Sequence, residues 1–278
     1  MKILIVHGIG NYRASVEPAE ASLLLRDSWL QSLREGAATT RDDLNISLSV
    51  AYYAHILRAS DSRQAGPDTV LTDDELDLFL SWADAYGVPI QKAQGPGTMP
   101  VRQVLSWVAG RGGAATEAVT SLVLRFIREV NEYFTVDEKR HRVRELVETE
   151  IRSQRPDLVI AHSLGSVVAY EALWNSDVPV PRLLTVGSPL GLRGGIFDRV
   201  MPGPVGGRGN KPDCVEQWVN VADRGDIVAI PRFLSDSYSG ISGDHETYIG
   251  RFAFHALGSY LSSADVGALI HFGGAGRD

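Results

Sequence analysis

Short apolar runs recur along the chain at intervals that suit strands. Lys2 to Val6 and Pro156 to Ile160 are nearly continuous apolar runs with β-branched residues. Runs of this length and composition are typical of strands buried on both faces of a parallel sheet. Leu44 to Tyr53 alternates between apolar and polar positions, which predicts a further strand. Arg182 to Val186 and Val215 to Val221 complete the predicted set, and the latter is the last clear strand.

Segments with helical apolar spacing separate these runs. They are Pro18 to Glu35, Thr72 to Tyr86, Val101 to Ala109, Ala115 to Phe134, Asp137 to Arg155 and Ser166 to Trp174. Strands that alternate with helices favour a parallel sheet, because each crossover needs a covering helix. The pattern predicts an α/β protein with a mostly parallel central sheet flanked by helices.

The alternation stops between about residues 55 and 134. This stretch contains predicted helices and Gly- and Pro-rich loops, with no predicted strand to join the sheet. We expect a single domain spanning residues 1–278, with residues 55–134 as a helical cap or lid inserted within it. A peripheral helical embellishment is the alternative interpretation.

Composition and charge narrow the classes of function. The chain has 278 residues, of which 44% are hydrophobic, and its formal net charge is −7. No basic block is present, so we expect no nucleic-acid partner. The single cysteine, Cys214, excludes an internal disulfide and a cysteine-based metal cluster. No apolar run is long enough for an integral membrane segment, and Met1 to Val6 is too short for a signal peptide. We therefore expect a cytoplasmic protein.

A serine stands where the second buried run meets a helix. The stretch is Ala161-His162-Ser163-Leu164-Gly165, between a predicted strand and a predicted helix. A sharp strand-to-helix turn exposes such a side chain at the carboxyl edge of a sheet, beside the free amides of the helix. A nucleophilic serine needs both features, because its oxyanion must find N–H donors already in place.

This stretch resembles the nucleophile elbow, G-x-S-x-G, of the α/β-hydrolase family, and departs from it where Ala161 replaces glycine. The resemblance implies an α/β-hydrolase fold with Ser163 as nucleophile. His7-Gly8-Ile9-Gly10 resembles the oxyanion loop of bacterial lipases in this family. It implies that the backbone N–H groups of Ile9 and Leu164 form the oxyanion hole. A dinucleotide-binding turn is the weaker alternative, because Arg13 stands where its third glycine belongs.

The family's other two triad members follow the serine in the order acid, then histidine. Asp226 lies in a segment that resembles the acid loop of lipases, and Asp223 is the alternate acid. His255 resembles the family's histidine because it precedes a helix with an aromatic-leucine pair, and His245 is the alternate. His271 lies too close to the end of the chain.

Ser188, in Gly187-Ser188-Pro189, is an alternative candidate for the nucleophile. Pro189 argues against it, because proline has no N–H to donate and disturbs the start of a helix. We interpret His7 and His162 as structural residues.

These residues together predict a serine esterase or lipase-like hydrolase that works through an acyl-enzyme, with no metal and no organic cofactor. The expected partner is a small-molecule or lipid-like acyl substrate. An acyltransferase or cyclase, a thioesterase or an amidase would use the same triad. A non-catalytic ligand-binding protein on the hydrolase fold is an alternative of another class. The oligomeric state stays open.

Overall fold

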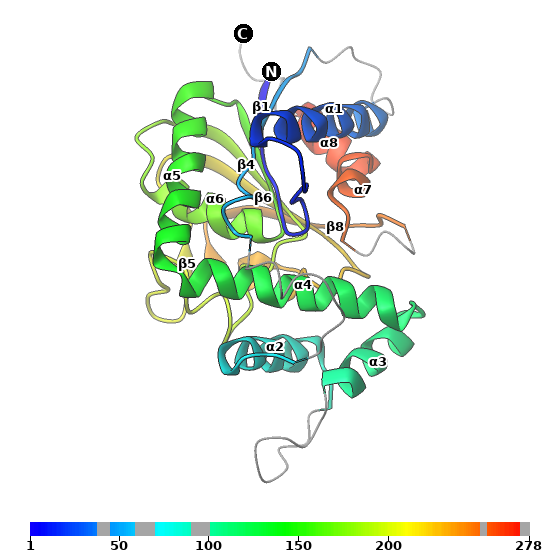
Figure 1. The fold of residues 1–278 in the computed structure, drawn as a ribbon. Coiled ribbons are helices and arrows are strands. Elements are labelled where there is room, and N and C mark those ends of the chain that lie inside the picture. The colour runs from blue at the N-terminus through cyan, green and yellow to red at the C-terminus, as the bar shows by residue number, and fades with distance from the viewer. Residues whose placement is uncertain (38–44, 59–69, 90–100, 251–254, 273–278) are drawn as a thin grey trace.

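The computed structural model describes residues 1–37, 45–58, 70–89, 101–250 and 255–272 (Figure 1). Within these residues, six strands form a central sheet in which every neighbouring pair is parallel. In spatial order they are β2 (Ser47–Ala51), β1 (Lys2–Val6), β3 (Leu158–His162), β4 (Val180–Val186), β6 (Val215–Asp223) and β8 (Ile241–Thr247). A small second sheet pairs β5 (Gly209–Asn210) with β7 (Tyr238–Ser239). The predicted α/β class with a parallel sheet is confirmed.

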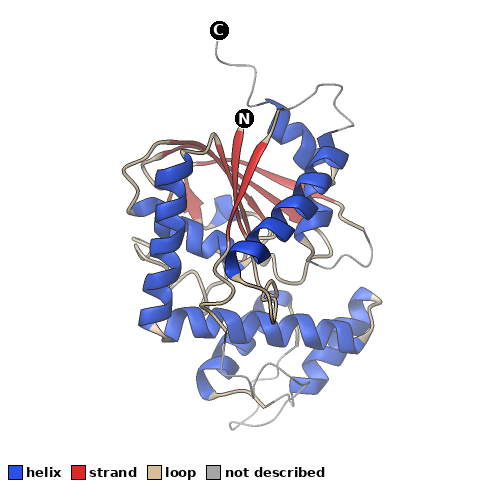
Figure 2. Cartoon of the chain, turned by 45° about the horizontal axis from the view of Figure 1, so that its top comes forward, coloured by secondary structure: helices blue, strands red, loops and turns tan. Residues whose placement is uncertain are grey.

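Helices cover both faces of the central sheet (Figure 2). The helices α1 (Pro18–Ala37), α7 (Leu257–Leu261) and α8 (Ala264–Phe272) pack together and share one core with the sheet. The helices α5 (Asp137–Gln154) and α6 (Leu164–Trp174) belong to the core of the opposite face. This two-layered cover is what a parallel sheet requires, because its strands are apolar on both sides.

Strand β1 shows how the sequence divides between the two cores. Ile3 and Ile5 pack in the core that contains α1, α7 and α8, whereas Leu4 and Val6 pack in the core that contains α5 and α6. Successive side chains of a strand point to opposite faces, so an unbroken apolar run fills both cores. All four side chains are at most 1% exposed.

Three further helices lie at the carboxyl end of the sheet (Figure 1). They are α2 (Asp73–Tyr86), α3 (Val101–Gly112) and α4 (Thr116–Thr135), and α4 contacts α2, α3 and α5. A capping box begins α2, because Thr72 accepts from the N–H of Glu75 and the Glu75 carboxylate accepts from the N–H of Thr72. Phe79 of α2 and Phe126 of α4 are buried in the same core as α6. These helices therefore share a core with the sheet layer, and their role as a cap or lid stays a prediction.

Strand β8 corrects the sequence analysis, which placed the last strand at Val215 to Val221. β8 pairs in parallel with β6, with an irregularity between Trp218 and Val219. Its sequence is mostly polar, because it lies at the edge of the sheet and most of its side chains are partly or fully exposed. Periodicity alone does not detect such a strand, since tertiary pairing rather than an apolar pattern defines it.

Some predictions fall outside the described residues. Leu44, the expected start of the second strand, and the loops at 60–68 and 91–100 are among them. In the described part of the chain, no helix combines the length and apolar character needed to cross a membrane. The cytoplasmic location stays a prediction.

Candidate active site

Ser163 stands at a strained turn between β3 and α6. Its backbone angles are φ 54° and ψ −131°, a region that residues other than glycine rarely adopt. Hydrogen bonds on both sides hold this geometry. The N–H of Ser163 donates to the carbonyl of Val186 at 3.2 Å, and its carbonyl accepts from the N–H of Ser166 at 2.9 Å. The sequence predicted this sharp turn, and the structure contains it.

Two glycines allow the start of α6 to approach the end of β1. A Cβ at Gly165 would lie 2.3 Å from the carbonyl oxygens of Val6 and His7, and a Cβ at Gly8 would lie 2.5 Å from Cβ of Ser163. Contacts this short exclude any side chain at either position. The second glycine of the elbow pattern therefore serves close packing against the strand that leads into the candidate oxyanion loop. Ala161, the departure from the pattern, is completely buried in β3.

His7 is fully buried and holds this loop from the inside. Its Nδ1 lies 2.8 Å from the carbonyl oxygen of Gly8, and its Nε2 lies 3.1 Å from the backbone nitrogen of Tyr53. The ring therefore donates from Nδ1 and accepts at Nε2. Burial is the main reason that its pKa falls to about 4. The Tyr53 hydroxyl donates to the carbonyl of His7. These contacts give His7 a structural environment, as expected from the sequence.

Ile9 and Leu164, the candidate oxyanion donors, follow the carboxyl ends of β1 and β3. Leu164 is the first residue of α6, where a backbone N–H has no acceptor within the helix. Ile9 follows Gly8, which packs directly on Ser163. The positive end of the helix dipole adds to the attraction for an anion at this position.

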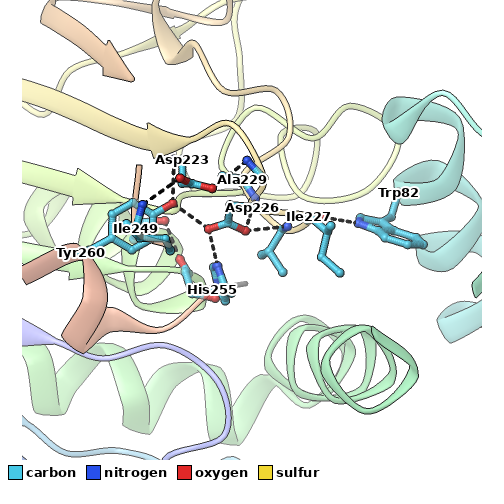
Figure 3. A network of polar contacts seen from close by, with 12 residues as sticks. Trp82, Asp223, Asp226, Ile227, Ala229, Ile249, His255 and Tyr260 are labelled. Carbon is cyan, nitrogen blue, oxygen red and sulfur yellow. Dashed lines mark hydrogen bonds and ion pairs between the residues drawn. The ribbon is translucent and has the colours of Figure 1, made fainter. Parts of the chain in front are cut away.

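Asp226 and His255 form a buried hydrogen-bonded pair (Figure 3). His255 Nδ1 lies 2.6 Å from Asp226 Oδ2, and the side chains are 3% and 0% exposed. The other carboxylate oxygen of Asp226 accepts from the N–H groups of Val228 at 2.8 Å and Ala229 at 3.2 Å. A buried carboxylate needs such partners, because desolvation penalises its charge.

The Tyr260 hydroxyl completes this network, and sequence reasoning assigned it no role. It donates to Asp226 Oδ2 at 2.7 Å and accepts from the N–H of Asp223 at 2.9 Å (Figure 3). Burial, followed by the charge of Asp226, raises the pKa of Tyr260 well above its usual value, so the hydroxyl keeps its proton. In the sequence, Tyr260 could have been noticed as an aromatic residue one turn into the predicted helix that follows His255.

The two alternates, Asp223 and His245, lie on the neighbouring strands β6 and β8. Asp223 ends β6, and its carboxylate accepts from the N–H groups of Gly225 at 2.7 Å and Ile249 at 2.9 Å. His245 is an exposed residue of β8, with its backbone opposite Val221. Within the described residues, neither side chain has a hydrogen bond or an ion pair with His255 or Ser163, whereas Asp226 and His255 are hydrogen-bonded directly.

Ser188, the rival nucleophile, belongs to a chain of hydrogen bonds. Its hydroxyl accepts from the N–H of Leu190 at 3.3 Å and lies 2.7 Å from the hydroxyl of Ser166. Ser166 in turn donates to the carbonyl of Ser163 at 2.6 Å. These hydrogen bonds connect Ser188 to the backbone of the elbow, and Ser188 is 2% exposed.

The elbow and the buried pair meet at the end of β4. Val186 binds the N–H of Ser163, and a Cβ on the next residue, Gly187, would lie 2.9 Å from Asp226 Oδ2 and 3.1 Å from His255 Cε1. The ring of His162 lies 4.5 Å from that of His255. Burial and the neighbouring His255 lower the pKa of His162 well below its usual value.

Ser163 Oγ and His255 Nε2 are both buried, and within the described residues neither has a hydrogen-bond partner. They therefore form no hydrogen bond with each other in this structure. Unpaired buried polar atoms are uncommon and often mark a site of function. Hydrogen bonds between a nucleophile and its base frequently form only when substrate is bound.

The described residues contain no group of three or more His, Cys, Asp and Glu side chains placed to hold a metal ion. Comparison of the chain with protein-family models, with curated proteins and with solved structures finds no match. The geometry of the site is therefore the basis for the functional proposal.

Proposed function

We propose that this chain is a serine hydrolase of the α/β-hydrolase fold that cleaves a carboxylic ester through Ser163, Asp226 and His255. One observation carries the proposal. The buried Asp226–His255 pair lies against the end of β4, the same strand end that binds the backbone of the strained Ser163. A nucleophile, a base and an acid that orients the base are the parts that acyl transfer requires.

The roles follow from the hydrogen bonds of His255. Because Nδ1–H donates to the Asp226 carboxylate, the lone pair of Nε2 is free to take a proton. Nε2 removes the proton of Ser163 Oγ as that oxygen attacks the ester carbonyl. Asp226 holds the imidazole in this tautomer and stabilises the imidazolium that forms.

The tetrahedral intermediate carries its negative charge on the former carbonyl oxygen. The N–H groups of Ile9 and Leu164 would bind that oxyanion. His255 then gives its proton to the leaving alkoxide, and the alcohol departs from an acyl-enzyme on Ser163. Water attacks the acyl carbon, His255 takes its proton, and the carboxylic acid leaves as Ser163 Oγ recovers a proton from His255.

Helices α2 to α4 would act as the cap that selects the acyl part. Trp82 of α2 donates from its indole nitrogen to the carbonyl of Ile227 at 2.7 Å, next to Asp226 (Figure 3). This contact connects the helical layer directly to the acid loop. The resemblance of the loops to those of lipases favours an ester with an apolar acyl part.

Acyl transfer to an acceptor other than water is the second candidate. The observation that favours it is the burial of the site, because Ser163 is 0% exposed and the His255 side chain is 3% exposed. A covered acyl-enzyme excludes water, which favours transfer of the acyl group to a bound alcohol or amine. A non-catalytic binding protein is the alternative of another class.

The test is hydrolysis of a p-nitrophenyl ester series, from acetyl to long acyl chains, by wild type and Ser163→Ala. We expect turnover by wild type and none above background by the variant, and the chain-length optimum then measures the acyl site. Labelling of Ser163 by a fluorophosphonate without any ester turnover would favour acyl transfer. An unreactive Ser163 would favour a binding protein.

A further inference from the structure

Helix α4 contacts the candidate oxyanion loop through Arg125 and Glu129, which lie one turn apart. Glu129 Oε1 accepts from the N–H of Gly10 at 2.9 Å. A Cβ at Gly10 would lie 2.7 Å from Nη1 of Arg125 and 3.1 Å from its Cδ, so Arg125 covers the same residue. Residues four apart lie on one face of a helix. Gly10 has φ +75°, the left-handed conformation that glycine adopts without strain.

The contact with Glu129 fixes one peptide plane of the loop. The Ile9–Gly10 peptide is planar, so its N–H and its carbonyl move together. Glu129 holds the N–H, and Asn11 Nδ2 donates to the carbonyl of Ile9 at 3.2 Å. Both edges of this peptide are therefore bonded.

The preceding peptide contains the candidate donor itself. The N–H of Ile9 shares its plane with the carbonyl of Gly8, which accepts from His7 Nδ1 at 2.8 Å and from Asn11 Nδ2 at 3.0 Å. With the next plane held by Glu129, the two torsions at Ile9 have little freedom. The direction of the Ile9 N–H is thus determined by contacts on both sides.

The packing of α4 in the core does not depend on Glu129. Its neighbours Phe126, Ile127 and Val130 are fully buried and already anchor α4 in the core. A half-buried carboxylate beside them is costly: burial is the main reason that its pKa rises to about 7, and the Gly10 N–H and Arg125 offset only part of that effect. The hydrogen bond that its oxygen accepts from the N–H of Gly10 accounts for a carboxylate at this position.

We propose that Glu129 is a positioning residue, which aims the oxyanion-binding N–H of Ile9 by holding Gly10. This inference rests on the proposed function, and it gives the helical layer a direct role in the chemistry. The oxyanion appears only during the reaction. Loss of the Glu129–Gly10 hydrogen bond is therefore expected to lower kcat rather than raise KM.

The test compares Glu129→Met with Glu129→Gln. Methionine matches the length of glutamate and suits a helix but offers no comparable acceptor, whereas the amide oxygen of glutamine can accept from Gly10. Glu117→Met is the matched control, because Glu117 lies exposed near the start of the same helix. Activity is measured on p-nitrophenyl esters and normalised to the Ser163 sites titrated by a fluorophosphonate, so that misfolded protein is not counted.

We expect Glu129→Met to lower kcat by about tenfold or more with KM changed less than about threefold. Glu129→Gln should recover most of that loss, and Glu117→Met should behave as wild type. Unchanged kcat in Glu129→Met would overturn the inference, as would an equal loss in Glu129→Met and Glu129→Gln. A wild type that neither turns over esters nor reacts with the fluorophosphonate would instead refute the proposed function, and the inference with it.

Discussion

His255 Nδ1 lies 2.6 Å from Asp226 Oδ2, and the two side chains are almost completely buried. The pair joins the loop after β6 to the residues before α7. The carboxylate has all its bonds inside the protein, which leaves the opposite ring nitrogen of His255 as the free end of the network.

Substitution of each aspartate by asparagine distinguishes Asp226 from Asp223 as the proposed catalytic acid. We expect Asp226→Asn to lower kcat/KM by about 10³–10⁴-fold, because an amide no longer fixes the productive tautomer of the imidazole. Asp223→Asn should lower kcat/KM by less than about tenfold, since in the described part of the chain the Asp223 carboxylate binds backbone N–H groups and no histidine. Steady-state kinetics on one ester decides the ranking, and the opposite order would show that Asp223 is the acid.

Tyr260→Phe tests the support of the pair. The change removes a hydrogen bond to Asp226 and leaves the buried N–H of Asp223 without its acceptor. We expect the free energy of unfolding to fall by about 1–3 kcal/mol. Urea unfolding measures it, with Tyr248→Phe as control because Tyr248 is 72% exposed. Equal stability of both variants and wild type would contradict the network.

The strained backbone of Ser163 predicts a conflict between stability and activity. Glycine tolerates φ 54° and ψ −131° far better than serine or alanine. We expect Ser163→Gly to be more stable to unfolding than Ser163→Ala by about 1 kcal/mol or more, although both lack the proposed nucleophile. If denaturant titration finds the alanine variant equal or more stable, the turn is not strained.

The low pKa of His7 predicts a loss of stability in acid. Its pKa is about 4 in the folded protein and about 6.5 when unfolded. The unfolded state therefore binds more protons, so the contribution of His7 is complete above pH 6.5 and is lost as the pH falls towards 4. The loss approaches about 3 kcal/mol. His7→Asn should lack this component, which unfolding curves of both proteins between pH 4 and 7.5 would measure. Parallel pH dependences would contradict the assignment.

The apolar pattern predicted the sheet interior, because β1, β3 and β4 owe their existence to burial on both faces. It could not predict β8, whose polar residues form a strand only through pairing with β6. The elbow was detectable at Ser163 because strand, serine, glycine and helix follow one another locally. Asp226 and His255 were ranked above Asp223 and His245 only through a family resemblance, and the structure brings the preferred two together.

For other contacts, the surrounding sequence does not show which atoms the side chain binds. Tyr260 and Glu129 act across 34 and 119 residues of sequence, and nothing near them in the chain marks the atoms they bind. The indole of Trp82 reaches the carbonyl of Ile227 in the same way. Side chains of this kind become visible only when distant segments are placed in space.

The reaction of a fluorophosphonate with the wild-type protein tests the central proposal most directly. Mass spectrometry of the digested adduct should place a single phosphonyl group on Ser163, and His255→Ala should slow the labelling by about 10²-fold or more. A protein that stays unmodified, or one labelled at Ser188 instead, would contradict the assignment of Ser163 as the nucleophile.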